Sequence, residues 1–253
     1  MLSEEEVVES ERSLFSVHDL FARVAVKYDL MNDAMSMGMH RLWKDYFVEQ
    51  LELTSNTTML DMAGGTGDIA FRAIKKIQQG LGKGSVTVCD INENMMGVGQ
   101  KRAVSNRSID KTRLVWVCCD AELLPFDDNS FDVYTIAFGI RNCTHIEKVL
   151  AESIRVLKAG GKFACLEFSR VDPLLKPFYD FYSFQIIPVM GEIIAGEYNS
   201  YRYLVESVRK FPDQIEFAKM LMGVGYEIVR YENLSCGICS IHTGIKRNSP
   251  DSL

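Results

Sequence analysis

The hydrophobic pattern divides the chain into a helical N-terminal region and a longer region of alternating elements. Residues 1–12 are mostly charged or polar, and we expect this end to fray. Residues 33–53 carry Trp43, Phe47 and Leu51 at a spacing of four, which predicts helix with one buried face. The same helical spacing occurs earlier, at Val17, Leu20, Phe21, Val24 and Tyr28.

From residue 57 onward, short apolar runs alternate with amphipathic segments. The pattern predicts strands at 57–61, 85–89, 113–119, 133–138 and 162–168, and helices at 68–79, 93–103 and 146–157. The last of these helices is followed by the glycine-containing segment 159–161, a C-cap signal. Such alternation is typical of a parallel sheet with helices on both faces.

The end of the chain departs from this alternation. Residues 225–231 and 237–245 predict two consecutive strands with a tight link, a hairpin that closes the sheet. We therefore expect a single α/β domain over residues 1–253 with a doubly wound, mostly parallel, seven-stranded sheet. Its parts are a helical cap (13–53), a core (57–170), an aromatic helical insertion (172–211) and a C-terminal helix with the hairpin (212–247).

Composition narrows the class of protein. The chain is 47% hydrophobic and 25% charged, and its net charge of −6 argues against nucleic acid as a partner. Its seven cysteines, an odd number, indicate reduced thiols rather than a disulfide framework. The lone C-x-x-C at 236–239 and the four dispersed histidines predict no metal site. Charged residues within 177–194 make a membrane span there unexpected.

A glycine-rich turn follows the first predicted strand. Gly64, Gly65, Thr66 and Gly67 lie where backbone can approach a ligand and the next helix presents free N–H groups. Asp90 ends the second strand, where a carboxylate can accept hydrogen bonds from ribose hydroxyls. Together these residues predict an adenine nucleoside site. The alternative is a plain tight turn, with Asp90 as the cap of the following helix.

Two nucleoside ligands fit this turn. Residues 65–70 also match G-x-G-x-x-A, the dinucleotide fingerprint of an NAD-dependent oxidoreductase. Downstream, however, Asp120 and Ala121 follow the third strand. In methyltransferases an acid here accepts a hydrogen bond from the adenine amino group, and the neighbouring backbone contacts the ring. The fifty helical residues before the first strand also favour a methyltransferase, as a cap over the methionine end of its cofactor.

Five segments then resemble a known family, the ubiquinone/menaquinone biosynthesis C-methyltransferases, over residues 17–246. They are FARVAVKYDLMNDAMSMGMHRLW (21–43), LDMAGGTGD (60–68), DAELLPF (120–126), FGIRN (138–142) and SYRYL (200–204). The segment 182–206 looks most similar to the mitochondrial branch that makes ubiquinone. The resemblance implies a class I methyltransferase fold and S-adenosylmethionine as cofactor.

The family's cofactor contacts fall on Thr66, Asp90, Asp120 and Ala121 of this chain. A further contact, a serine in bacterial members, falls on Ala137, where only backbone can make it.

Tyr28 is a candidate for closing over the methionine part of the cofactor, with a core aromatic as the equal alternative. The family's catalytic position falls on Arg141, with Asn142 beside it. Because a guanidinium stays protonated, we expect Arg141 to stabilise a phenolate and to orient a water that carries the proton. A surface salt bridge is the alternative.

The implied reaction is C-methylation of a polyprenylated methoxy-benzoquinol. Tyr201 and Arg202 are the predicted contacts to the quinol head. Tyr182 and the aromatic run 178–184 are candidates for the prenyl tail, or are the buried faces of ordinary helices.

Three rival functions remain at this point. They are methylation of a menaquinone-type naphthoquinol, NAD-dependent oxidoreduction, and a non-catalytic scaffold of a quinone-synthesis complex. The resemblance also implies peripheral membrane contact on the matrix face of the mitochondrial inner membrane, with a presequence absent from this chain. Other ubiquinone-biosynthesis proteins, and a second copy in a homodimer, are the expected partners.

Overall fold

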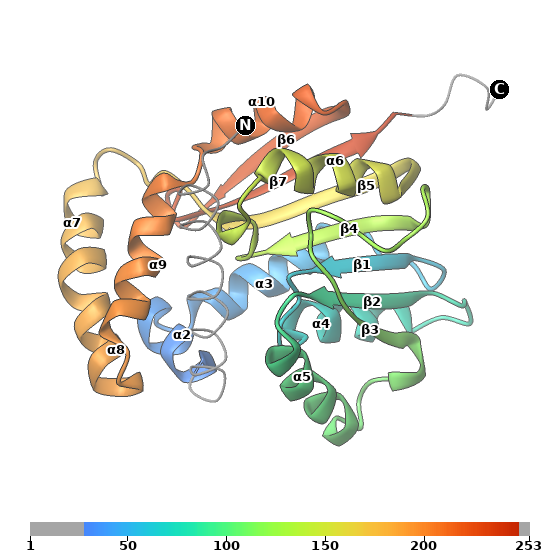
Figure 1. The fold of residues 1–253 in the computed structure, drawn as a ribbon, viewed down its shortest axis with the longest axis horizontal. Helices are drawn as coiled ribbons and strands as arrows, with labels where there is room; N and C mark the ends of the chain where they lie inside the picture. The colour runs from blue at the N-terminus through green and yellow to red at the C-terminus, as the bar shows by residue number, and fades with distance from the viewer. Residues whose placement is uncertain (1–27, 248–253) are drawn as a thin grey trace, which may run out of the picture.

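A computed structural model describes residues 28–247, with side chains from residue 30 onward. The predictions for residues 1–27 lie outside this range. Tyr28 begins the first described helix, but its predicted contact with the cofactor also lies outside the described side chains. Figure 1 shows a twisted sheet with helices on both faces and a separate helical layer at the end towards which the parallel strands point.

The described chain forms these strands: β1 (Thr58–Met62), β2 (Ser85–Asp90), β3 (Leu114–Cys118), β4 (Phe131–Ala137), β5 (Leu157–Phe168), β6 (Tyr226–Leu234) and β7 (Cys239–Lys246). Its longer helices are α2 (Tyr28–Ser36), α3 (Met39–Glu49), α4 (Asp68–Ile77), α5 (Glu93–Ser105), α6 (Ile146–Val156), α7 (Lys176–Phe181), α8 (Ile187–Ala195), α9 (Tyr198–Lys210) and α10 (Gln214–Gly223). Short helical turns are η1 (Lys111–Arg113), η2 (Ile140–Asn142) and the π-helical η3 (Tyr182–Ile186).

The seven strands form one sheet in the order β3-β2-β1-β4-β5-β7-β6. β1 to β5 pair in parallel, and β7 pairs antiparallel with both β5 and β6. This arrangement confirms the predicted doubly wound sheet closed by a C-terminal hairpin. The order reverses at β1, between β2 and β4, and ligands bind at such a switch point in open α/β sheets.

Successive side chains of each strand pack on opposite faces of the sheet. Met59 of β1 packs into the core cluster that contains α3, α4 and α5 side chains, whereas Leu60 packs into the cluster with α6 and α10. Successive strand residues point to opposite faces, so a strand that is covered on both sides must be apolar throughout. This explains why the central strands are continuous apolar runs in the sequence.

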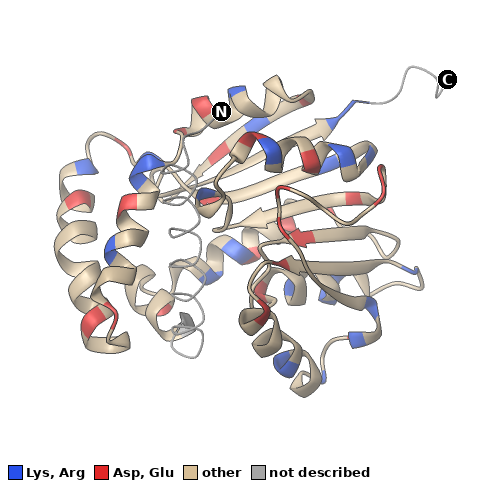
Figure 2. Ribbon diagram, viewed as in Figure 1, with Lys and Arg blue, Asp and Glu red and all other residues tan. Residues whose placement is uncertain are grey.

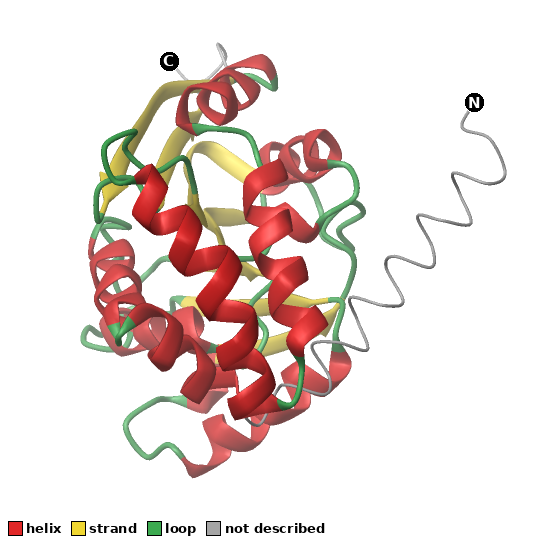
Figure 3. Cartoon of the chain, turned by 90° about the vertical axis from the view of Figure 1, so that its left-hand side faces the viewer, coloured by secondary structure: helices red, strands yellow, loops and turns green. Residues whose placement is uncertain are grey.

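A third, smaller cluster holds the helical layer together. Met31 of α2 packs with Ile187 of α8 and with Tyr201 and Val205 of α9. Gly191 allows α8 and α9 to approach closely, because a Cβ at this position would lie 2.2 Å from the Tyr201 ring. Figure 3 shows these helices lying across the ends of the strands. None of the described helices is long and apolar enough to cross a membrane.

Two predicted boundaries were wrong. The helix expected over 33–53 breaks at Gly38, whose left-handed backbone (φ 77°) separates α2 from α3. The segment 159–161 does not cap α6, which ends at Val156. Instead it lies within β5, as a bulge between the paired positions Leu157 and Lys162. Leu157 already pairs with β4 in extended conformation, so the helix must end before it.

Acid should destabilise this fold through His242 of β7. Its ring is 1% exposed, and its Nε2 donates to the Gln214 carbonyl at 2.9 Å. Burial lowers the pKa of His242 from 6.5 to about 4. The unfolded chain therefore binds the proton first, and stability is lost as pH falls from 6.5 towards 4, by roughly 3 kcal/mol for 2.5 pKa units. In His242→Gln, urea unfolding at pH 7.5 and pH 4.5 should differ by less than in the wild type. An equal difference would contradict the assignment.

Candidate functional site

A cavity of about 570 Å³ opens at the carboxyl ends of β1, β2 and β4. We call it the nucleoside cavity. The predicted residues that line it are Gly64, Gly65, Thr66, Asp90, Asp120, Ala121, Ala137 and Asn142. The sheet therefore brings together residues from four separate segments of the sequence. Gly67 does not line the cavity and acts through the turn instead.

The glycine-rich turn is held tightly against β2. The Gly64 N–H donates to the Cys89 carbonyl at 2.9 Å, and the Gly65 N–H donates to Asp90 Oδ2 at 2.8 Å. Gly67 is the N-cap that precedes α4, with φ 82°, and a Cβ there would lie 2.9 Å from both the Phe71 and Trp116 rings. The turn therefore needs glycine at this position for its backbone angle and for space.

Asp90 joins the turn to the next helix. Its Oδ2 accepts from Gly65, and its Oδ1 accepts from the Asn92 N–H at 2.8 Å. The cap of α5 is Asn92, whose side chain accepts from the Met95 N–H. The alternative interpretation of Asp90 as the helix cap was therefore wrong. Asp90 also lines the nucleoside cavity.

The sequence analysis missed Asp61, the last-but-one residue of β1. Asp61 is 1% exposed and lines the nucleoside cavity. Its Oδ1 accepts from the Thr135 hydroxyl at 2.9 Å, but Oδ2 is buried without a partner. Burial raises the pKa of Asp61 to about 7. The signal that could have found it is an acid at the end of a buried strand, directly before the glycine turn.

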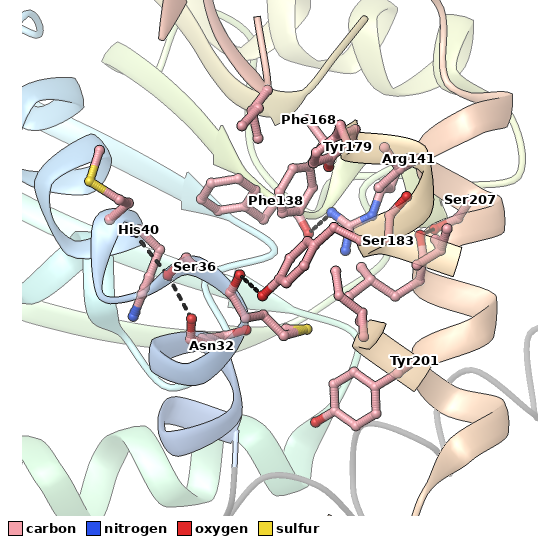
Figure 4. Close-up of a pocket in the computed structure, with 18 of the residues that line it drawn as sticks. Asn32, Ser36, His40, Phe138, Arg141, Phe168, Tyr179, Ser183, Tyr201 and Ser207 are labelled. Atoms are coloured by element: carbon pink, nitrogen blue, oxygen red, sulfur yellow. Dashed lines mark hydrogen bonds between the residues drawn. The ribbon is translucent and has the colours of Figure 1, made fainter. Parts of the chain in front are cut away.

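A second cavity, of about 400 Å³, lies between the strand ends and the helical layer. We call it the apolar cavity, and Figure 4 shows its lining. It contains Arg141 and Tyr182 among mainly apolar side chains. Lys44, Phe138 and Asn142 line both cavities. A group held in one cavity can therefore meet a group held in the other at these three residues.

Arg141 is deeply buried beside a second missed residue, Glu167. Arg141 Nη1 donates to Glu167 Oε1 at 2.8 Å and to the Phe138 carbonyl at 2.5 Å. The two charged side chains are only 3% and 1% exposed. The guanidinium also lies 5.4 Å from the centre of the Phe168 ring. The alternative of a surface salt bridge was therefore wrong, since this ion pair sits in the wall of the apolar cavity.

Two of the three predicted substrate residues line the apolar cavity, and the third does not. Tyr182 lines the apolar cavity, and its hydroxyl donates to the Met35 carbonyl at 2.9 Å. Tyr201 also lines it, although Figure 4 shows its ring pointing away from Arg141. Arg202 does not line it. Its side chain is 63% exposed and pairs with Glu206 one turn along α9, because the adjacent Tyr201 takes the buried face of the helix.

Two further residues of α3, Lys44 and His40, also line these cavities. Lys44 Nζ lies 2.7 Å from Asp68 Oδ2, and this pair borders the nucleoside cavity. Burial raises the pKa of Asp68, but its cationic neighbours outweigh that effect and lower the pKa to about 2. His40, one turn earlier, lines the apolar cavity and contacts Asp33. The sequence analysis treated His40 as an isolated histidine and missed this placement.

Comparison with known proteins identifies the family. The model of the ubiE/COQ5 methyltransferase family matches residues 5–246. The chain belongs to this family. Its cofactor is S-adenosylmethionine.

Several relatives share the name 2-methoxy-6-polyprenyl-1,4-benzoquinol methylase, mitochondrial. The protein from Caenorhabditis elegans is 58% identical, over 91% of this chain and 79% of its own length. The mouse protein is 49% identical, over 96% and 83%, and the human protein is 47% identical, over 95% and 83%.

Solved structures with low sequence identity share the fold. The [4+2]-cyclase SpnF has a TM-score of 0.66 at 15% identity and covers 92% of this chain and 96% of its own. A methyltransferase from Thermotoga maritima, titled SAM-dependent, has a TM-score of 0.62 at 18% identity, with 91% and 100% covered. These likenesses show that the methyltransferase fold persists in distant sequences.

The residues of the nucleoside cavity fit S-adenosylmethionine in this methyltransferase. The cofactor carries a sulfonium and an α-ammonium group, and the acidic residues Asp61, Asp68, Asp90 and Asp120 line the cavity. The unpartnered Oδ2 of Asp61 can accept from a cationic donor, which a buried carboxylate needs. Asp90 lies between the glycine turn and α5, where it can reach the ribose.

Asp61→Asn should weaken cofactor binding by about tenfold, or roughly 1.4 kcal/mol, because it removes the negative charge from an isosteric side chain. Asp61 is ionised above pH 7, so the wild type should bind S-adenosylhomocysteine more weakly as pH falls from 8 to 6. Calorimetry on the variant should show a Kd that changes little over this range. The exposed Asp127→Asn is the control, and unchanged affinity in Asp61→Asn would remove Asp61 from the site.

Proposed function

We propose that this chain methylates a ring carbon of a 2-methoxy-6-polyprenyl-1,4-benzoquinol in ubiquinone biosynthesis. Support comes from relatives of this name at 47–58% identity over most of the chain. One observation of the structure carries the proposal: the nucleoside cavity meets the apolar cavity at Lys44, Phe138 and Asn142. A methyl donor in the first cavity then faces an apolar acceptor in the second.

The junction suits attack by a carbon nucleophile. When bound, S-adenosylmethionine supplies an electrophilic methyl group on a cationic sulfur. The chain aligns the acceptor ring with this group, so that binding replaces a chance encounter. Asn142 and Phe138 belong to one short segment after β4, which sets the direction from which the ring approaches. The aromatic and apolar lining excludes water from the reacting atoms.

Arg141 has an electrostatic role in this proposal. Loss of a hydroxyl proton makes the ortho ring carbon strongly nucleophilic, and the negative charge then needs stabilisation. A guanidinium keeps its charge at all working pH values, so it can stabilise a phenolate and orient a water but cannot accept the proton. Glu167 holds Arg141 in position through the 2.8 Å ion pair.

The apolar cavity also supports a substrate with a prenyl tail. Tyr182 and Tyr201 extend its lining from η3 and α9, away from the junction. Menaquinone-type naphthoquinol methylation is not favoured, because the relatives are named as benzoquinol methylases. The oxidoreductase and scaffold alternatives are not favoured, since the family and the relatives are methyltransferases.

The proposal extends to the setting in which the enzyme works. The named relatives are mitochondrial, and we place this chain at the matrix face of the inner membrane, in peripheral contact with it. Large apolar side chains on α7, η3 and α8 support such contact; they are Phe178, Phe181, Phe184, Val189 and Ile193, all exposed. Other ubiquinone-biosynthesis proteins, and a second copy of the chain, are the proposed partners. Basic and acidic residues are interspersed over the described surface, as Figure 2 shows, and we propose no nucleic-acid partner.

A direct assay tests the proposed reaction. Under anaerobic reducing conditions, the chain should transfer a radiolabelled methyl group from S-adenosylmethionine to a short-tailed demethyl benzoquinol. It should transfer less to the matching demethyl naphthoquinol. Transfer to the naphthoquinol alone would contradict the proposed substrate. Calorimetric binding of NADH in place of S-adenosylhomocysteine would overturn the cofactor assignment, and binding without any transfer would favour the scaffold.

Arg141→Ala should abolish methyl transfer and leave S-adenosylhomocysteine affinity near normal, because Arg141 lines only the apolar cavity. The single variant leaves Glu167 buried without its partner, which costs about 3–5 kcal/mol of stability. The double variant Arg141→Ala with Glu167→Gln removes both charges and controls for this effect. A folded double variant with normal turnover would remove Arg141 from the mechanism.

A further inference from the structure

His40 lines the apolar cavity, and one of its ring nitrogens has no hydrogen-bond partner. The residue lies in the first turn of α3 and is 7% exposed. Its Nε2 lies 2.9 Å from Asp33 Oδ1 of α2. The other ring nitrogen, Nδ1, is buried and has no hydrogen-bond partner. A polar atom buried in this way is costly unless a ligand or a water satisfies it.

The contact with Asp33 determines which ring nitrogen carries the proton. An ionised carboxylate only accepts hydrogen bonds, so His40 Nε2 must be the donor and Nδ1 holds a lone pair. Arg41 keeps Asp33 ionised, because its Nε and Nη2 each donate to the Asp33 carboxylate at 2.7 Å. These hydrogen bonds, first that from Arg41 and then that from His40, hold the pKa of Asp33 well below its usual range.

His40 lies close to the place where the methyl group is transferred. It precedes Lys44 by four residues on α3, so the two side chains share one face of the helix, about 5–6 Å apart at Cβ. Both line the apolar cavity, and Lys44 also lines the nucleoside cavity. Figure 4 shows His40 and Arg141 on opposite sides of the cavity with Phe138 between them. The imidazole and the guanidinium thus line the same cavity from two sides of Phe138, which is one of the junction residues.

We propose that His40 is the catalytic base that removes the hydroxyl proton of the quinol, with Asp33 as its positioning residue. This inference rests on the proposed methyl transfer to a quinol. The two residues then have separate roles in the deprotonation of the quinol. Neutral His40 Nδ1 accepts the proton, and Arg141 stabilises the phenolate that remains. Asp33 then stabilises the imidazolium.

The protons and electrons balance in this scheme. The phenol O–H proton moves to His40 Nδ1. The ortho carbon forms its bond to the methyl group as the sulfur–methyl bond breaks, and sulfur keeps that electron pair. The ring hydrogen on the same carbon leaves as a proton to water, which restores the aromatic phenolate. The phenolate takes its proton back from the imidazolium, so one proton is released in each turnover.

The charges that face His40 come from three helices. Asp33 lies on α2, Arg41 and Lys44 on α3, and Asp68 on α4. Burial lowers the pKa of His40 below 6.5, the hydrogen bond that His40 donates to Asp33 opposes this effect, and Lys44 lowers the pKa further. Arg141 on η2 and Tyr203 on α9 line the same cavity. The imidazole is therefore neutral at pH 7 and able to accept a proton.

His40→Gln provides the test, because the glutamine amide can keep the donor to Asp33 and so preserve the link between α2 and α3. We expect kcat to fall by about 10²–10⁴-fold with a short-tailed demethyl benzoquinol. S-adenosylhomocysteine affinity and Tm should change little. In the wild type, kcat/KM should rise with pH as His40 deprotonates, and this rise should disappear in the variant. Added imidazole should restore part of the activity.

Two controls sharpen the result. Leu42→Ala changes an exposed side chain of the same helix that lines neither cavity, and should behave as the wild type. Asp33→Asn removes the carboxylate, so NMR titration of the His40 ring should show a lower pKa, and the pH profile should shift the same way.

A fully active His40→Gln, or a variant that keeps the wild-type pH profile, would overturn the inference and leave the proposed function standing. A wild-type chain that methylates no quinol would remove both.

Discussion

The ion pair between Arg141 and Glu167 is the interaction on which the arrangement of the two cavities depends. Two charges taken out of water cost several kcal/mol each, and only good geometry offsets that cost. Here one Arg141 nitrogen bonds both Glu167 at the end of β5 and the Phe138 carbonyl after β4. Phe138 itself has a left-handed backbone (φ 54°), a conformation that persists only where its surroundings enforce it. The pair therefore holds in place the segment after β4, which lies at the junction of the two cavities.

The electrostatics of the cavities differ in the way that the reaction requires. The nucleoside cavity is lined by four aspartates, which suits a ligand that carries cationic sulfur and nitrogen. The apolar cavity offers one buried guanidinium and one imidazole with an unpartnered nitrogen, which suits a hydroxyl that loses its proton. Lys44, paired with Asp68, lines both cavities. Each residue then acts in the charge state that its neighbours stabilise.

The two sites also rest on different hydrophobic cores. The nucleoside cavity is built on the doubly covered sheet, whose clusters include α4 and α5 on one face and α6 and α10 on the other. The apolar cavity is closed by α2, α8 and α9, which pack through a small cluster of their own around Met31 and Tyr201. Few apolar contacts mean low local stability, so we expect this layer to open before the sheet does. Such opening would expose the apolar cavity and leave the sheet around the nucleoside cavity in place.

The sequence by itself determined the strands, their mostly parallel pairing with a closing hairpin, and the glycine-rich turn and strand-end acids that the fold gathers around one cavity, among them Gly65, Asp90 and Asp120. These follow from local patterns, because a doubly covered strand must be apolar and a turn against a nucleotide must be glycine-rich. Only the tertiary structure decided the rest. It paired Arg141 with Glu167 and His40 with Asp33, left Asp61 with an unpartnered oxygen, and turned Arg202 to solvent. Burial and pairing between different elements set the charge and direction of these side chains. Local sequence patterns do not show which residues of different elements will be in contact.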